Sequence, residues 1–167
     1  NLGLTTFHGS TVLTLRQIDH QDRWEFQQHG EFLSPIMIIR SIGGLDFAGT
    51  ISGIWSLQDG SKAVSDDLVF SAAAVIGHDD EIWVGLRNGL SKLKRHENRW
   101  SEVDRTTSIS FDAISVLQTE PQALWVGSLV GRVARVKLKE ASSLASGEFE
   151  EFGQSAGLPK ATISLEQ

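Results

Sequence analysis

Residues 81–90 read Glu-Ile-Trp-Val-Gly-Leu-Arg-Asn-Gly-Leu, with an aromatic residue two positions before a glycine and a second glycine four positions further on. The aromatic-x-Gly pattern occurs four times, at glycines 36 to 42 residues apart, namely Gly9, Gly49, Gly85 and Gly127. A fixed spacing in this range is typical of repeat proteins. We therefore predict four repeats, centred on residues 9, 49, 85 and 127, in one domain that covers residues 1–167.

Each repeat contains short runs of β-branched and aromatic residues separated by turn residues, which favours strands over helices. In the third repeat these runs predict strands over residues 71–77, 81–86, 89–95 and 99–103. Four antiparallel strands in every repeat of about 40 residues are typical of a β-propeller, whose blades surround a channel. The predicted fold is an all-β propeller of four blades, with the Trp or Phe of each repeat packed between neighbouring blades.

The two ends of the chain bear on how such a ring would close. Three strands precede the second repeat, the three later repeats supply four each, and Ala161 to Leu165 supply a last one. These sixteen strands are enough for four blades if the last strand pairs with the strand that begins at Leu2, which would hide both edges. The alternative is that the chain is a fragment of a larger propeller, and the sequence leaves both readings open.

Composition excludes several classes of protein. Lys and Arg number 15 against 21 Asp and Glu, so the formal net charge is −6, whereas a nucleic-acid binder needs a clustered basic surface. No apolar run reaches the roughly 18 residues of a membrane helix. The absence of cysteine excludes disulfides and thiolate metal sites. We predict no nucleic-acid partner and no cofactor.

The repeats resemble those of two-component-regulator propellers. The resemblance is carried by residues 81–90, by Ala123-Leu124-Trp125-Val126-Gly127-Ser128, and by Gly157-Leu158-Pro159 followed by Ile163. It implies an extracytoplasmic sensor of a histidine kinase or a related signalling protein, periplasmic or extracellular, which often senses carbohydrates. It also implies that a signalling domain outside this chain receives the signal. Because the family usually has more than four blades, the resemblance favours the fragment reading.

Candidate ligand-binding residues lie in loops expected near the channel mouth, where propeller ligands usually dock. Arg87, Asn88 and Arg105 are the strongest polar donors there, and a guanidinium beside an amide can clasp sugar hydroxyls or a carboxylate. Asp112, within an expected inner strand, is a candidate acceptor in the channel. The corresponding loops of other repeats add Thr50 and Ser128. The structural alternatives are that these residues cap turns, pair with Asp104, or pair with a neighbouring blade.

Other functions find less support in the sequence. The run His78-Asp79-Asp80-Glu81 looks like a metal site, but alternation along a strand would let at most two of these residues converge, so no metal site is predicted. No clustered nucleophile, histidine and acid is found, and we expect no enzymatic activity. The loop at residues 137–147 is expected to be flexible. Two hypotheses remain: a sensor of a small polar ligand or oligosaccharide, and a protein-interaction scaffold. Either could also form a homodimer through its edge strands.

Overall fold

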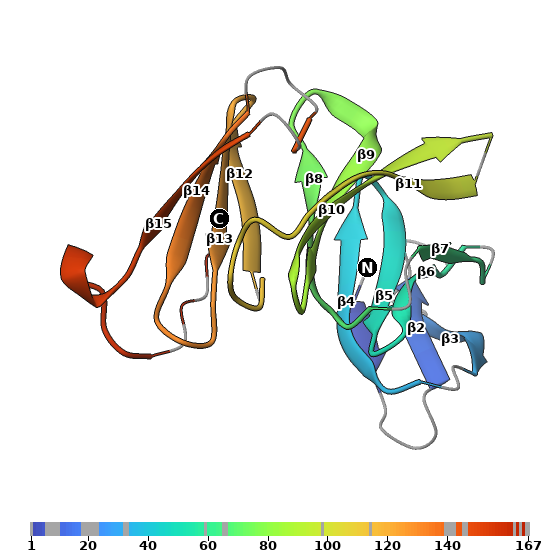
Figure 1. The fold of residues 1–167 in the computed structure, drawn as a ribbon. Helices are drawn as coiled ribbons and strands as arrows, with labels where there is room; N and C mark the ends of the chain where they lie inside the picture. The colour runs from blue at the N-terminus through green and yellow to red at the C-terminus, as the bar shows by residue number, and fades with distance from the viewer. Residues whose placement is uncertain are drawn as a thin grey trace.

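The fold of the chain is seen in a computed structural model, which describes residues 2–5, 11–17, 24–31, 34–58, 60–64, 67–97, 99–113, 115–138, 143–144, 147–161, 163 and 165. In this part of the chain the regular structure is almost entirely β (Figure 1). The strands are β1 (Leu2–Thr5), β2 (Thr11–Gln17), β3 (Trp24–Glu31), β4 (Ile36–Ile42), β5 (Leu45–Thr50), β6 (Gly53–Ser56), β7 (Lys62–Val64), β8 (Val69–Val75), β9 (His78–Leu86), β10 (Gly89–His96), β11 (Arg99–Thr106), β12 (Ser115–Glu120), β13 (Ala123–Gly127), β14 (Val133–Lys137) and β15 (Glu148–Phe152). A single 3-10 turn, η1 (Gln154–Ala156), follows the last strand.

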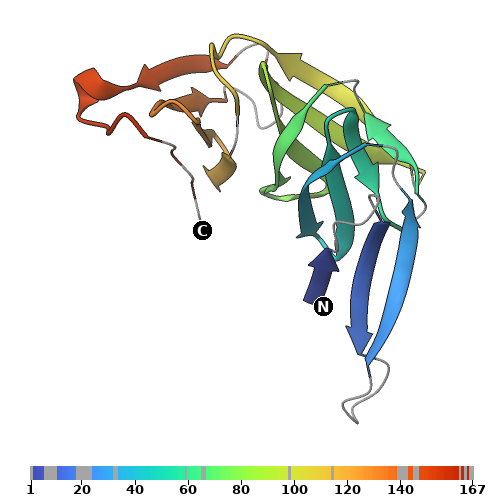
Figure 2. The ribbon, with the colours of Figure 1, turned by 90° about the horizontal axis from the view of Figure 1, so that it is seen from below.

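The strands form antiparallel sheets in sequence order. Strands β4 to β7 form blade B, β8 to β11 form blade C, and β12 to β15 form blade D. Strands β1 to β3 form a three-stranded sheet. The three blades follow one another along an arc, with their first strands on the inner side (Figure 2). The expected all-β architecture of four-stranded antiparallel sheets is therefore confirmed for three repeats.

The predicted four complete blades are not confirmed. The first repeat contributes only three strands, and the described residues Ala161, Ile163 and Leu165 are not in a strand. Instead, the Ile163 amide donates to the Ser128 carbonyl at 2.7 Å, which holds this segment against blade D. The expected terminal strand is thus replaced, in its described residues, by an extended segment that contacts blade D.

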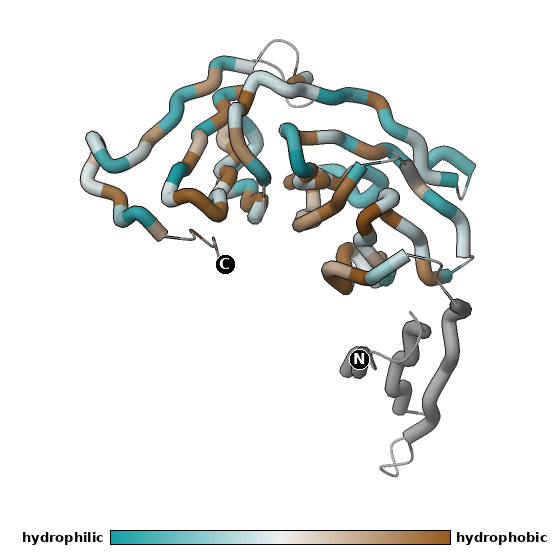
Figure 3. The backbone as a smooth tube through the Cα atoms, turned by 60° about the horizontal axis from the view of Figure 1, so that its bottom comes forward, coloured by the Kyte–Doolittle hydropathy of each residue, from teal (hydrophilic) through white to brown (hydrophobic). Residues whose placement is uncertain are grey.

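Apolar side chains fill the spaces between the blades, and apolar stretches alternate with hydrophilic ones along the strands (Figure 3). Phe47 of blade B meets Trp100 of blade C edge to face, with ring centroids 5.2 Å apart. Trp83 of blade C is fully buried in the cluster shared with blade D. The prediction that the repeated aromatic residue packs between blades is confirmed at these two positions.

The two glycines of blades B, C and D serve different purposes. The second one, Gly53, Gly89 or Gly131, has a positive φ that other residues rarely adopt. The first one allows close approach instead: a Cβ on Gly85 would lie 2.2 Å from the carbonyl oxygen of Ala113, which leads into blade D.

One described residue of the connection between β14 and β15 packs into the core. Leu144 is completely buried in the cluster between blades C and D. Its amide donates to a carboxylate oxygen of Asp104 at 2.5 Å. Residues 139–142 and 145–146 of the loop expected to be flexible lie outside the described residues, so its flexibility stays a prediction. Leu144 shows that one apolar side chain of this Ser- and Ala-rich run is buried.

Candidate functional site

One edge of the blades carries the turns from the second to the third strand. These turns are residues 50–53 in blade B, 86–89 in blade C and 128–132 in blade D, and we call this side the turn edge. In blade C the Arg87 amide donates to the Leu68 carbonyl at 3.0 Å, and the Ala113 amide donates to the Leu86 carbonyl at 2.9 Å. The turn thus meets both the segment leading into its own first strand and the segment leading into the next blade. The expected gathering of these loops on one side is confirmed for blade C.

Arg87 and Asn88 are at the exposed tip of the blade C turn. Neither side chain makes a hydrogen bond or ion pair with any residue that the structure describes. A guanidinium and an amide held next to each other on a two-residue turn offer several donors to solvent. Both side chains are therefore exposed and unpaired within the described part of the chain.

Arg105 lies near them, because Thr106 pairs with Leu90 directly after the turn. Its guanidinium is committed to other groups: it donates twice to Glu102, at 2.8 and 3.0 Å, and is 3.6 Å from Asp67. The hydrogen bonds to Glu102 raise the pKa of Arg105 above its ordinary value. Its structural role is therefore pairing with Glu102 and Asp67 rather than with Asp104.

The remaining predicted site residues are placed differently from one another. Asp112 does not lie in an inner strand as expected, because β12 begins only at Ser115. It is half-buried directly before Ala113, on the segment that touches the blade C turn. Thr50 and Ser128 are completely buried, and their hydroxyls bond within their own turns. The Thr50 hydroxyl donates to the Gly53 carbonyl at 2.9 Å, and the Ser128 hydroxyl accepts from the Arg132 amide at 2.8 Å. Direct ligand contact by any of the six residues stays a prediction.

Sequence reasoning missed the apolar tips of the other two turns. Ile51 in blade B is 50% exposed, and Leu129 and Val130 in blade D are 47% and 60% exposed. Their position in the turns equivalent to that of Arg87 and Asn88 was predictable from the glycine spacing, but the exposure of these large apolar side chains was not. The turn edge therefore presents a polar tip in blade C between apolar tips in blades B and D.

A second cluster lies at the start of β9, on the side away from the turn edge. Glu81 is 5% exposed, and its carboxylate is 2.7 Å from the Lys92 ammonium, which is 2% exposed. Lys94 donates to the same carboxylate at 3.0 Å. Burial would raise the pKa of Glu81, but the hydrogen bonds and charges of the two lysines outweigh it and lower that pKa.

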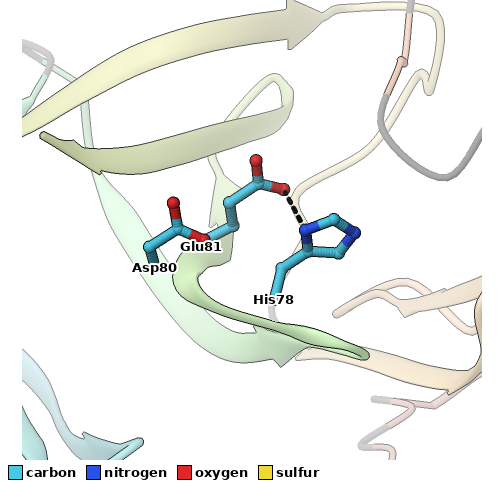
Figure 4. A group of neighbouring side chains, drawn as sticks. All are labelled: His78, Asp80 and Glu81. Atoms are coloured by element: carbon cyan, nitrogen blue, oxygen red, sulfur yellow. Dashed lines mark ion pairs between the residues drawn. The ribbon is translucent and has the colours of Figure 1, made fainter.

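The same cluster includes two more candidate metal ligands, His78 and Asp80 (Figure 4). One ligand atom from each of these two residues and Glu81 lies within 4.8 Å of the others, so the expectation that at most two could converge is wrong. Alternation fails here because a positive-φ glycine at 77 and a register shift begin the strand. The Glu81 carboxylate is already neutralised by two ammonium groups, which disfavours a cation at this place.

An apolar hollow of about 180 Å³ lies on blade D. It is lined by Trp125, Val133, Phe152, Ala156 and Leu158. The Trp125 and Phe152 rings are tilted against each other, with centroids 6.1 Å apart. No residue of this hollow was a predicted ligand contact.

Comparison with known proteins identifies the fold. No protein-family model matches the chain, and no curated protein matches it. Among solved structures, the chain is similar to the extracellular domain of the putative one component system BT4673 from B. thetaiotaomicron, with a TM-score of 0.57 and 18% identity. That match covers 78% of this chain and 17% of the other.

A second similar structure is the N-terminal domain of Nup159, with a TM-score of 0.54 and 14% identity. It covers 88% of this chain and 46% of that domain, so the chain spans less than half the length of either protein. Among the described residues, no helix is long and apolar enough to cross a membrane. At these identities the similarity concerns the fold, and the chain has a β-propeller fold of antiparallel four-stranded blades.

Proposed function

We propose that the chain is a ligand-sensing propeller module of an extracytoplasmic signalling receptor. Its ligand is a small polar molecule, with an oligosaccharide as the first class to test, and it binds at the turn edge. The module binds without catalysing a reaction. A histidine-kinase or other signalling domain outside this chain receives the signal.

The observation that carries the proposal is the polar tip of blade C. Arg87 and Asn88 are exposed, and no described residue pairs with their side chains, although the turn that bears them is fixed at two backbone bonds. Because the backbone of this turn is already fixed, a ligand would have to order only the two side chains and not the loop itself. The structural similarity to an extracellular domain of a one component system supports the location and the sensing role.

The first experiment is a thermal-shift and calorimetric screen of the chain against neutral and acidic oligosaccharides. A binding sugar is expected to raise the melting temperature, because it stabilises only the folded state. The variant Arg87→Ala/Asn88→Ala is expected to lose this shift. Arg99→Ala, at an exposed arginine near the opposite end of the same blade, serves as the matched control. Equal binding by both variants would contradict the proposed site.

The second candidate function is a protein-interaction scaffold. It is favoured by the exposed apolar tips of blades B and D, since exposed apolar patches often mark protein contacts. Under this alternative, Ile51→Ser with Val130→Ser would abolish binding of a protein partner, whereas Arg87→Ala/Asn88→Ala would weaken it less. The two functions therefore predict opposite rankings of the same two variants.

A further inference from the structure

The outer face of blade D, meaning the side of its sheet that faces away from blade C, carries Trp125, Val133 and Phe152 around the apolar hollow. Trp125 occupies the same repeat position as Phe47 in blade B and Trp83 in blade C, since each stands two residues before the first glycine. Phe47 and Trp83 are 1% and 0% exposed, because the next blade covers them. Trp125 is half-buried beside the hollow.

The backbone around blade D repeats the way in which blade C is joined to blade D. Between those two blades, the Ser71 hydroxyl donates to the Ala113 carbonyl at 3.0 Å. On the outer side of blade D, the equivalent Ser115 hydroxyl donates to the Ile163 carbonyl at 3.4 Å. Leu165, two residues after Ile163, is the equivalent of Ser115, which stands two residues after Ala113. The Leu165 amide donates to the Ser115 hydroxyl at 3.1 Å.

The first glycine of blade D shows the same close approach. A Cβ on Gly127 would lie 2.3 Å from the Ile163 carbonyl oxygen, just as one on Gly85 would meet the Ala113 carbonyl oxygen at 2.2 Å. The serine bond and the glycine contact both involve the Ile163 carbonyl, as the equivalent pair in blade C involves the Ala113 carbonyl. They place residue 163 where a segment leads into a further blade.

Polar groups on the outer face show what chemistry the covering sheet must have. In blade C, Trp83 donates its indole N–H to Gln118 of blade D at 2.8 Å, and Lys92 lies over the Trp83 ring. In blade D, Arg135 lies over the Trp125 ring at 5.6 Å, and its buried Nε has no hydrogen-bond partner. By the same geometry, a side-chain acceptor at the position of Gln118 on the covering sheet would accept from the Trp125 indole N–H. A second acceptor on that sheet would supply the partner that the Arg135 Nε lacks.

We propose that the outer face of blade D is a docking surface for one further four-stranded propeller blade, whose first strand continues from the positions of Ile163 and Leu165. That blade presents small apolar residues to Trp125 and acceptor side chains to the indole and the Arg135 guanidinium. This inference is independent of the ligand, so it stands or fails separately from the sensing function.

The test is an extended chain in which residues 1–164 are followed directly by a second copy of residues 115–165. The probe is blade D itself, which already docks against the equivalent face of blade C. The tryptophan of the added copy is changed to Phe, and the acrylamide quenching of Trp125 is obtained by subtracting the spectrum of Trp125→Phe. In the extended chain, acrylamide is expected to quench Trp125 no more than it quenches buried Trp83. The melting temperature is expected to rise.

A charge on the face supplies the matched comparison. Trp125→Glu should remove the gain in melting temperature that the extended chain shows. It should change the melting temperature of the parent chain much less. Val103→Glu, on an exposed part of β11, should be neutral in both. Continued quenching of Trp125 in the extended chain, or an added copy that stays unfolded by hydrogen exchange, would overturn the proposal. A parent chain that dimerises and protects Trp125 unaided would also overturn it and assign the face to a second copy.

Discussion

Replacing Glu81 with Gln tests whether the buried pair in blade C stabilises the fold. The change leaves the Lys92 ammonium, 2% exposed, without the carboxylate that lies 2.7 Å away. Removing one partner of a buried ion pair usually costs about 3–5 kcal/mol. We expect a loss of about 3 kcal/mol, at the lower end of this range. For a chain of this size, that corresponds to a fall in melting temperature of about 6–12 °C.

The assay is thermal and urea unfolding at pH 7, followed by circular dichroism. Lys94→Met is the matched control, because Lys94 contacts the same carboxylate from a largely exposed position and should change stability little. The double variant Glu81→Leu/Lys92→Met should recover most of the loss, since an apolar pair avoids the desolvation of two charges. A Glu81→Gln variant as stable as the parent, or a double variant no better than the single one, would refute this reasoning.

Three further predictions concern the same blades. Folding lowers the pKa of Glu81, so its ionised carboxylate stabilises the fold fully above the unfolded pKa of about 4.3, and this stabilisation is lost as the pH falls through the lowered value. When the free energy of unfolding is measured against pH in acid, Glu81→Gln should lack this part of the pH dependence. Gly85→Ala should destabilise the chain strongly, because the new methyl would meet the Ala113 carbonyl oxygen at 2.2 Å, whereas Gly153→Ala, with open space and an extended backbone, should be neutral in the same melts. Gln118→Leu removes the acceptor shared by the buried Trp83 indole N–H and the part-buried Ile76 amide, and should cost about 1–3 kcal/mol in urea unfolding; a loss below about 0.5 kcal/mol would show that water replaces the amide.

The repeat, the strands and the inter-blade aromatic residues were predictable from the sequence because each depends on local spacing. A period of about 40 residues, alternation along strands, and glycine pairs around a tight turn are all visible within one repeat. Phe47 and Trp83 accordingly lie between blades as expected. The number of complete blades was not predictable in this way, because it depends on whether a strand finds a neighbour rather than on its composition.

The site was only partly predictable, because side-chain pairing is decided by the register between strands. The turn carrying Arg87 and Asn88 follows from the glycine spacing, but the commitment of Arg105 to Glu102 depends on how β11 lies against its neighbours. Likewise, Lys92 meets Glu81 across strands β9 and β10, although a charged residue in a strand suggests an exposed face. Register over several strands is set by packing that one sequence does not display.

Within each repeat, the residues that join neighbouring blades are different from the residues in which the blades differ from one another. The first glycine of blades C and D contacts the segment leading onward, and a serine bonds to that segment, so this part of the two blades is nearly identical. The tips of the three turns differ, with Ile51 in blade B, Arg87 and Asn88 in blade C, and Val130 in blade D. A change at a turn tip leaves the inter-blade contacts intact, whereas a change at the glycine does not. Recognition specific to this chain is therefore best sought at the turn edge, where a ligand that contacts several blades meets polar groups between apolar ones.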